Sequence, residues 1–557
     1  MTGAGTSGAG TTGAGTTGAG TTGAVTLEVY DTTLRDGAQQ EGLSLSVADK
    51  LAIARHLDDL GVGVIEGGWP GAIPKDTQFF ARAAEELKLR HARLAAFGST
   101  RRAGGRASSD TQVRALLDSR APVVTLVAKS HVGHVEKALR TTPQENLAMV
   151  ADTVAFLVAE GREVVLDAEH FFDGWLLDRA YALEVLQVAL ASGATTAALC
   201  DTNGGHLPDV VADLVADVVA VTGARLGIHC HNDTGCAVAS TLAAVDAGVV
   251  QVQGTLNGYG ERTGNADLVT VLANLELKRD RRVLPPGGLA EATRIAHAVS
   301  EITNVPPYSR QPYVGSSAFT HKAGLHASAI RVDPDLYQHV DPTAVGNDMR
   351  MLVSEMAGRA SIELKGRELG LDLSDPALLS TVTDAVKARE QEGYTYEAAD
   401  ASFELLVRRV ACELRLGDDV PDYFHVDSWR VITETRPGAG HGDATSEATV
   451  RLVTASGRTV ATAEGNGPVN ALDAALRTAL TPTYPELRDL ELVDFRVRIL
   501  DSSHGTDAVT RVLLETADDG ASWTTVGVGP NIVEASWEAL VDGLAYGLLH
   551  RQVPTRA

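Results

Sequence analysis

The sequence lacks any long uninterrupted apolar run. Although 44% of its residues are hydrophobic, no stretch approaches the roughly 20 apolar residues that a membrane-spanning helix needs. Basic residues are also scarce, because 48 lysines and arginines face 72 aspartates and glutamates and leave a formal charge of −24. Such a surface repels polyphosphate, which excludes nucleic acid as the general partner. A CoA thioester still fits, because it needs only a local basic site or a helix terminus.

Cysteine is scarce as well. The four cysteines, Cys200, Cys230, Cys236 and Cys412, have neither disulfide-framework nor metal-ligand spacing, which is typical of a reducing compartment. Residues 1–24 repeat Gly, Ala and Thr without charge or apolar bulk, and this composition predicts a disordered tail. The tail lacks the features of a secretory signal or a transit peptide. We therefore expect a soluble cytoplasmic protein.

From Val25 the chain alternates short apolar or β-branched runs with helical stretches, such as Val47–Leu60 and Ala180–Ala191. This alternation argues for a parallel sheet with crossover helices. The eight runs begin near Leu27, Val62, Arg93, Val123, Glu163, Thr195, Leu226 and Val250. Eight strand-and-helix units in about 260 residues predict a TIM (β/α)₈ barrel over residues 25–285. A doubly wound sheet is the alternative, but no Gly-rich fingerprint follows the first strand.

The chain after residue 285 becomes mainly helical. Helical spacing in Ala290–Ile302 and Pro376–Glu390 predicts a linker or lid region over residues 286–402. Strands are expected to return from about Phe403.

Two similar segments near the C-terminus, Gly465-Asn-Gly-Pro468 and Gly527-Val-Gly-Pro530, each precede a helical stretch. They predict an internal duplication of a strand-rich unit that ends in a helix. We expect residues 403–557 to form a C-terminal α+β domain with a regulatory role.

Polar side chains gather at two predicted strand ends. The first strand ends in Asp31-Thr-Thr-Leu-Arg35-Asp36-Gly37 and the seventh in His229-Cys-His231-Asn-Asp233. Two histidines separated by one residue project to the same face of a strand. A carboxylate from another strand would complete a mixed nitrogen and oxygen site suited to Mn²⁺, Mg²⁺ or Zn²⁺.

Arg35 and Thr202 are candidates for substrate binding. Arg35 has the planar fork that holds a carboxylate in two hydrogen bonds, and its alternative role is a salt bridge in the barrel mouth. A metal beside an arginine suits a 2-oxo acid, because the metal polarises the ketone and the arginine receives the carboxylate. Thr202 would donate its hydroxyl to the same carboxylate.

A general base is expected at the end of the fifth strand. Glu169 follows Val165-Leu-Asp-Ala, and a buried glutamate with a raised pKa removes a proton from a thioester methyl group. Asp167 and His170 are alternatives, and position in the sequence does not choose among the three.

Together these motifs resemble the group of 2-isopropylmalate, homocitrate and citramalate synthases in the DRE-TIM metallolyase superfamily. The likeness covers nearly the whole chain after the tail and includes Gly260-Glu-Arg-Thr-Gly264-Asn265 and Phe319-Thr-His-Lys-Ala-Gly-Leu-His326-Ala. It implies a TIM barrel that condenses acetyl-CoA with a 2-oxo acid and then hydrolyses the CoA ester.

The resemblance also implies the role of each site residue. A divalent metal is bound by Asp36, His229 and His231, with Asn265 as a further ligand or close neighbour. Arg35 and Thr202 hold the 2-oxo acid, and Glu169 is catalytic. His326 and Tyr337 match the pair that the linker supplies to the active site. The C-terminal domain is similar to the family's regulatory domain, which binds an end-product amino acid and helps to form a homodimer.

The acceptor is the remaining question. Ile65-Glu-Gly-Gly-Trp-Pro-Gly71 and the following Pro74-Lys-Asp76 look more like the citramalate synthase branch, which implies pyruvate as acceptor and isoleucine as feedback ligand. A 2-isopropylmalate synthase acting on 2-oxoisovalerate or a homocitrate synthase acting on 2-oxoglutarate stays open, since one methylene changes binding by only about 1 to 3 kcal/mol. A carbon–carbon lyase and a non-catalytic amino-acid sensor are the alternatives of other kinds.

Overall fold

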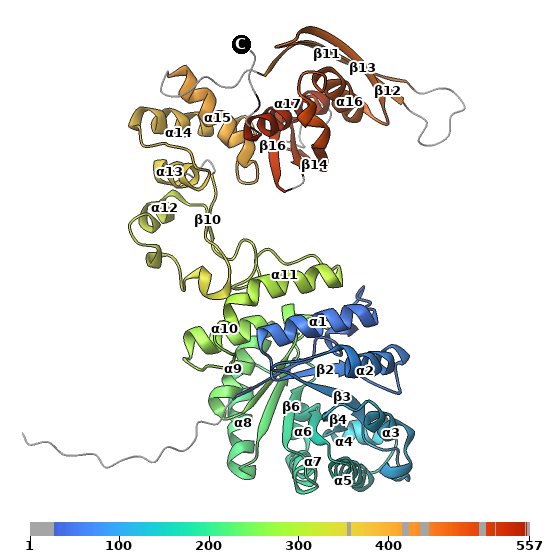
Figure 1. Cartoon of the computed structure of the whole chain (residues 1–557). Coiled ribbons are helices and arrows are strands. Elements are labelled where there is room, and N and C mark those ends of the chain that lie inside the picture. The colour runs from blue at the N-terminus through green and yellow to red at the C-terminus, as the bar shows by residue number, and fades with distance from the viewer. Residues whose placement is uncertain are drawn as a thin grey trace, which may run out of the picture. The chain divides into compact units, whose positions relative to one another are not determined.

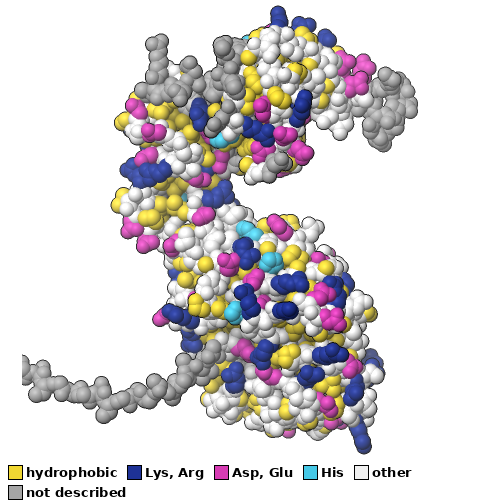
Figure 2. All heavy atoms as spheres, viewed as in Figure 1, with side chains coloured by type: hydrophobic (Ala, Val, Ile, Leu, Met, Phe, Trp, Pro, Cys, Tyr) yellow, Lys and Arg dark blue, Asp and Glu magenta, His cyan; other side chains and the backbone are white. Residues whose placement is uncertain are grey.

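The computed structural model describes residues 27–353, 358–414, 423–434, 445–500, 508–518, 520–551 and 553. The tail predicted over residues 1–24 lies outside these ranges. Contacts divide the chain into two compact units, which are Met1–Ala318 with Pro342–Asn347, and Phe319–Asp341 with Asp348–Ala557. Within the described ranges, no helix has the length and apolar character to cross a membrane. The face shown in Figure 2 carries acidic and basic side chains interspersed.

The first unit contains a closed barrel of eight parallel strands (Figure 1). These strands are β1 Glu28–Asp31, β2 Val64–Gly68, β3 Arg93–Ser99, β4 Val123–Lys129, β5 Glu163–Glu169, β6 Thr196–Asp201, β7 Leu226–Cys230 and β8 Gln251–Gly254. β1 pairs with both β2 and β8, so the sheet closes. The predicted TIM barrel is therefore confirmed, and the doubly wound alternative is wrong.

Helices follow the strands around the barrel. They are α1 Val47–Leu60, α2 Pro74–Glu86, α3 Thr111–Asp118, α4 Val132–Lys137, α5 Pro143–Ala159, α6 Phe171–Leu177, α7 Arg179–Ala191, α8 Pro208–Thr222, α9 Ala237–Ala247, α10 Leu268–Lys278 and α11 Ala292–Thr303. α1 has the bounds that the sequence predicted for this helix, and a capping box of Ser46 and Asp49 begins it. α11 packs against α1, because Ile295 and Val299 form its buried apolar face. The barrel unit therefore extends beyond residue 285.

The second unit begins with a mainly helical region, as predicted. It contains β9 Thr320–His321, α12 Gly324–Ile330, β10 Arg350–Met351, α13 Arg359–Glu368, α14 Pro376–Gln391 and α15 Asp400–Glu413. The expected return of strands at Phe403 is wrong, because Phe403 is buried within α15 and the next strand begins at Phe424. The buried residues Phe403, Leu406, Val407 and Val410 recur with helical rather than strand spacing.

The C-terminal domain repeats one architecture twice. β11 Phe424–Glu434, β12 Thr445–Thr454, β13 Gly457–Gly465 and α16 Pro468–Leu480 form the first copy, and β14 Glu491–Ile499, β15 Thr510–Ala517, β16 Ser522–Gly529 and α17 Ile532–His550 form the second. Each sheet is antiparallel, and both helices contribute to one apolar core. The predicted duplication is confirmed.

Close packing explains the glycines in the two repeated segments. A Cβ on Gly527 would lie 2.0 Å from the backbone oxygen of Ala535, and a Cβ on Gly465 would lie 2.5 Å from the backbone nitrogen of Ala471. In both copies the helix thus approaches the last strand so closely that only glycine fits.

Candidate metal centre and active site

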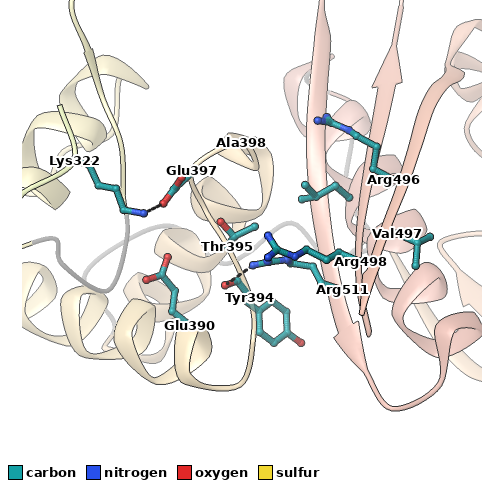
Figure 3. A pocket seen from close by; sticks show the side chains of 11 residues that line it. Lys322, Glu390, Tyr394, Thr395, Glu397, Ala398, Arg496, Val497, Arg498 and Arg511 are labelled. Carbon is teal, nitrogen blue, oxygen red and sulfur yellow. Dashed lines mark hydrogen bonds and ion pairs between the residues drawn. The ribbon is translucent and has the colours of Figure 1, made fainter. Parts of the chain in front are cut away.

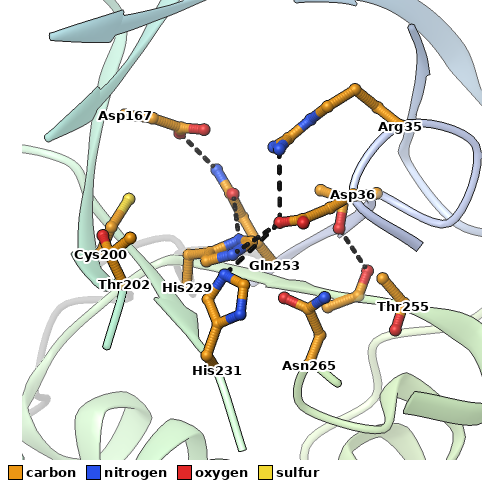
Figure 4. A network of polar contacts seen from close by, with 12 residues as sticks. Arg35, Asp36, Asp167, Cys200, Thr202, His229, His231, Gln253, Thr255 and Asn265 are labelled. Carbon is orange, nitrogen blue, oxygen red and sulfur yellow. Dashed lines mark hydrogen bonds and ion pairs between the residues drawn. The ribbon is translucent and has the colours of Figure 1, made fainter. Parts of the chain in front are cut away.

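Asp36, His229 and His231 converge at the C-terminal ends of β1 and β7 (Figure 4). One ligand atom from each residue lies within 4.8 Å of the others. The Nε2 atoms of His229 and His231 lie 3.1 Å and 3.7 Å from Asp36 Oδ2. The turn that carries Asp36 is held by Asp31, whose carboxylate accepts hydrogen bonds from the amide and hydroxyl of Thr33 at 2.9 Å and 2.8 Å.

The electrostatics of this cluster favour an ionised carboxylate beside imidazole. Burial opposes ionisation of Asp36, but Arg35 and the two histidines outweigh it and hold its pKa well below the usual range. Burial and the neighbouring His229 lower the pKa of His231 to about 4. His231 is therefore neutral at physiological pH, and a neutral imidazole is the form that binds a metal.

Gln253 orients His229 from behind. Its side-chain oxygen accepts a hydrogen bond from His229 Nδ1 at 3.0 Å, and its nitrogen donates to Asp167 Oδ1 at 3.0 Å. This arrangement fixes the tautomer and turns Nε2 toward Asp36. Such second partners of a ligating histidine set its orientation and basicity. Gln253 was not among the residues predicted from the sequence, although a glutamine inside a short barrel strand was a signal.

Asn265 lies beside His231. Its backbone forms a bridge with His231, and its side-chain nitrogen donates to the backbone oxygen of Tyr259 at 2.9 Å. Its Oδ1 atom is buried and finds no hydrogen-bond partner in the described part of the chain, which is rare for a buried amide. One carboxylate, two imidazoles and an unsatisfied amide oxygen fit a divalent metal ion.

Arg35 is held beside this cluster by a buried carboxylate. Its Nε donates to Glu66 Oε1 at 2.5 Å, and its guanidinium lies 4.0 Å from the centroid of the Phe97 ring. Glu66 also accepts a 2.7 Å hydrogen bond from the Tyr30 hydroxyl. Burial alone would lower the pKa of Arg35, but Glu66 and Asp36 raise it. Sequence analysis missed Glu66, whose signal was an acid within the apolar run of β2.

A cavity of about 620 Å³ opens at the barrel mouth and is lined by Arg35, Asp36, Glu169, Thr202 and His231, among others. The structure thus brings together most of the residues singled out from sequence. Lys129, at the end of β4, also lines the cavity and forms an ion pair with Glu169. Sequence analysis missed this lysine.

The three candidates for the general base occupy different environments. Glu169 lines the cavity. Asp167 lies within the hydrogen-bonded chain through Gln253, and burial raises its pKa to about 6. The ring of His170 packs against His134, with 4.0 Å between centroids, and its amide donates to Thr202 Oγ1 at 2.8 Å.

His326 and Tyr337 lie in the second unit. Their rings stack with 4.1 Å between centroids. Their role in catalysis stays a prediction.

The barrel and its cluster define the class of protein. An HMGL-like family model matches residues 26–299. A homocitrate synthase post-HMGL domain-like model matches residues 313–393, and a LeuA allosteric (dimerisation) domain model matches residues 397–548. The chain is therefore a barrel of the HMGL-like class joined to a domain of the LeuA allosteric type.

Curated relatives define the family more narrowly. An (R)-citramalate synthase of Streptomyces coelicolor is 63% identical over 529 residues, which cover 95% of this chain and 98% of that relative. An (R)-citramalate synthase of Synechocystis sp. is 47% identical, and the match covers 94% of this chain and 96% of that relative. A 2-isopropylmalate synthase of Pyrococcus furiosus is 30% identical, and the match covers 93% of this chain and 98% of that relative. The chain belongs to the citramalate synthase family.

Proposed function

We propose that this protein is an acyltransferase that condenses acetyl-CoA with pyruvate and water to give (R)-citramalate and CoA. The observation that carries the proposal is the likeness to (R)-citramalate synthases along nearly the whole chain. The cavity at the barrel mouth supports it, because Arg35, Glu169 and two of the three proposed metal ligands, Asp36 and His231, line one space. The product would enter isoleucine biosynthesis.

Each step of the reaction has a residue suited to it. Glu169 removes a proton from the acetyl methyl group, and the resulting carbanion attacks the ketone carbon of pyruvate. Arg35 binds the pyruvate carboxylate through the side of its guanidinium that Glu66 leaves free, and Thr202 supplies a further polar contact. His326 and Tyr337 are the proposed proton donors to the alkoxide that forms. Water then cleaves the thioester, which releases CoA.

The proposed metal ligands are Asp36, His229 and His231, with Asn265 Oδ1 as a fourth donor. A divalent ion held there, Mn²⁺, Mg²⁺ or Zn²⁺, would polarise the pyruvate ketone and stabilise the alkoxide that forms. The chain's own contribution is to hold these donors in register through Gln253 and the β1 turn.

We propose isoleucine as the feedback ligand. A second cavity, of about 620 Å³, lies in the second unit, where β11 and α17 supply most of its lining and Tyr394 and Arg409 the rest of one side. One wall of this cavity is apolar and is formed by Val426, Trp429 and Trp537. Another part of the lining is charged, because Arg409 and Asp542 form an ion pair there at 2.5 Å. An aliphatic amino acid matches both, because its side chain is apolar and its backbone groups carry opposite charges.

We also propose a homodimer built on the C-terminal domain. Phe495, Val497 and Ile499 of the edge strand β14 are exposed, although Phe495 and Val497 pair across the sheet with the buried Leu514 and Val512. A second copy would cover this row of apolar side chains.

The cytoplasm stays the proposed location, because all four cysteines are free and free cysteines are typical of a reducing compartment.

Release of CoA from acetyl-CoA tests the proposed activity. The assay compares pyruvate, 2-oxoisovalerate and 2-oxoglutarate, with Mn²⁺ or Mg²⁺ and with isoleucine or leucine as inhibitors. We expect pyruvate-dependent release that isoleucine inhibits. Preference for 2-oxoisovalerate with inhibition by leucine would overturn the substrate, and no release with any acceptor would overturn the enzyme itself.

A further inference from the structure

The second unit contains a cavity of about 630 Å³ that has no part in the proposed reaction (Figure 3). One wall is the face of β14 and β15 that carries Arg496, Arg498 and Arg511. The other wall is the segment from Glu390 to Ala398, with Lys322 beside it. Every lining residue belongs to the same compact unit.

Two arginines of this cavity are direct neighbours across the sheet. Arg498 and Arg511 are register partners on β14 and β15, and like charges placed opposite each other destabilise a sheet. Burial and then the charge of Arg498 lower the pKa of Arg511. Arg511 donates to the backbone oxygen of Tyr394 at 3.4 Å. Within the described ranges, neither Arg498 nor Arg511 forms an ion pair with a carboxylate.

The remaining charges do not neutralise the cavity. Arg496 is paired with Asp494 at 2.9 Å, and Lys322 is paired with Glu397. Four basic and two acidic side chains line the cavity, in a chain whose net charge is −24. The local excess of positive charge is therefore opposite in sign to that of the whole protein.

Solvated arginines that protect an edge strand are the ordinary explanation of such a cluster. That explanation does not account for Arg511, which is half-buried on the central strand of its sheet. The same sheet is apolar elsewhere, since Leu513, Val526 and Val528 pack into the core around α15. The change from apolar to cationic coincides with the cavity.

We propose that this cavity binds a small dianion, held in forked hydrogen bonds by Arg498 and Arg511 with Arg496 and Lys322 alongside. Guanidinium groups match the paired oxygens of phosphate and of carboxylate, so a phosphate monoester and a dicarboxylate share the required chemistry. The cavity has the volume of a metabolite site, which is typically about 300 to 1,000 Å³. Binding would relieve the repulsion between the two arginines.

Tyr394 gives this site a route to the proposed amino-acid cavity, which it also lines. Its backbone oxygen accepts from Arg511, and its hydroxyl donates to Glu538 at 2.8 Å. The dianion site itself rests on the geometry of the cavity that Arg498 and Arg511 line and does not depend on the proposed activity.

Isothermal titration calorimetry of the full chain tests the site, with inorganic phosphate and succinate as probes against chloride at equal ionic strength. The variants are Arg498→Gln and Arg511→Gln. Arg458→Gln is the matched control, because Arg458 is an exposed arginine on β13 that pairs with Asp427 at 2.8 Å and carries the same charge. Thermal unfolding verifies that each variant folds, and removal of a like charge leaves the midpoint equal or higher.

We expect saturable binding of at least one probe to the wild type and to Arg458→Gln, weakened at least tenfold in both test variants. Binding of phosphate alone assigns a phosphate-bearing ligand, and binding of succinate alone assigns a dicarboxylate. The site is overturned if neither probe binds, if the test variants bind as the wild type does, or if Arg458→Gln weakens binding equally.

Discussion

The cavity at the barrel mouth and the cavity of the proposed dianion site hold their arginines in opposite ways. At the barrel mouth, Arg35 is fixed by the buried Glu66 and the ring of Phe97. In the second unit, Arg498 and Arg511 stand opposite each other without a carboxylate partner among the described residues. The first arrangement fixes the geometry before a substrate arrives, whereas in the second the proposed anion would offset the repulsion between the two arginines.

The two cavities therefore differ in how firmly their arginines are held before a ligand binds. A reaction needs groups held in one geometry, and buried partners from neighbouring strands supply that. A binding site for a regulatory ligand gains from groups that its ligand alone neutralises, because the ligand then changes the stability of its surroundings.

The largest effect is expected from the metal-ligand cluster. His229→Ala should abolish turnover, by at least roughly 10⁴-fold, because the ketone loses its Lewis acid. Chelation of the wild type should do the same, and Mn²⁺ or Mg²⁺ should restore activity. Metal content and CoA release are measured together, with His91→Ala, an exposed histidine just before β3, as control. A variant that keeps its metal and its turnover would disprove the assignment.

The next effect concerns the base. Glu169→Gln should reduce kcat roughly 10²- to 10⁴-fold without loss of metal. Glu163→Gln is the control, because it lies on the same strand at the opposite end of the barrel. Near-normal turnover of Glu169→Gln would transfer the role of base to His326, and His326→Ala would then carry the large loss.

A smaller effect should follow from loosening Arg35. Glu66→Gln removes the charged partner that holds Arg35 Nε, leaves the guanidinium with Asp36 alone at 3.3 Å, and should reduce kcat/KM for pyruvate roughly five- to hundredfold, mainly through a higher KM. Metal content should not change, which separates positioning of Arg35 from loss of the cluster. An equal fall in kcat with an unchanged KM would place Glu66 in the chemical step instead.

The sequence predicted the barrel well because buried parallel strands are short apolar runs separated by amphipathic helices. All eight runs correspond to observed strands. α15 was missed because Phe403-Glu-Leu-Leu-Val407 is a short apolar run, and such runs do not distinguish a strand from a buried helix. Length and flanking residues would have been the better guide.

The site was predictable only in part. Asp36, His229 and His231 could be proposed because they stand at strand ends, where a barrel gathers its chemistry. Glu66 and Gln253 lie inside strands, and their roles depend on which side chains point inward and at which level of the stagger. Neither quantity can be taken from a single sequence. Lys129 stands at a strand end, so its omission was avoidable.

The smallest effect is a pH dependence of stability at Asp31, which is buried beneath the barrel mouth in the turn that leads to Asp36. Burial raises the pKa of Asp31 to about 7, above the value of about 3.9 in an unfolded chain. The folded state therefore binds more protons than the unfolded state between these values, and stability falls as pH rises from about 4 to 7, with a slope of at most about 1.4 kcal/mol per pH unit. Asp31→Asn, which keeps an oxygen for the Thr33 amide, should lose this dependence. The urea midpoint of the variant should exceed that of the wild type by an increasing amount as pH rises through 5, 6, 7 and 8.

The control is the same series of urea midpoints on Arg498→Gln, which should run parallel to the wild type because arginine does not titrate in this range. A constant difference for Asp31→Asn would show that the buried carboxyl is satisfied as an ion by its contacts with Thr33.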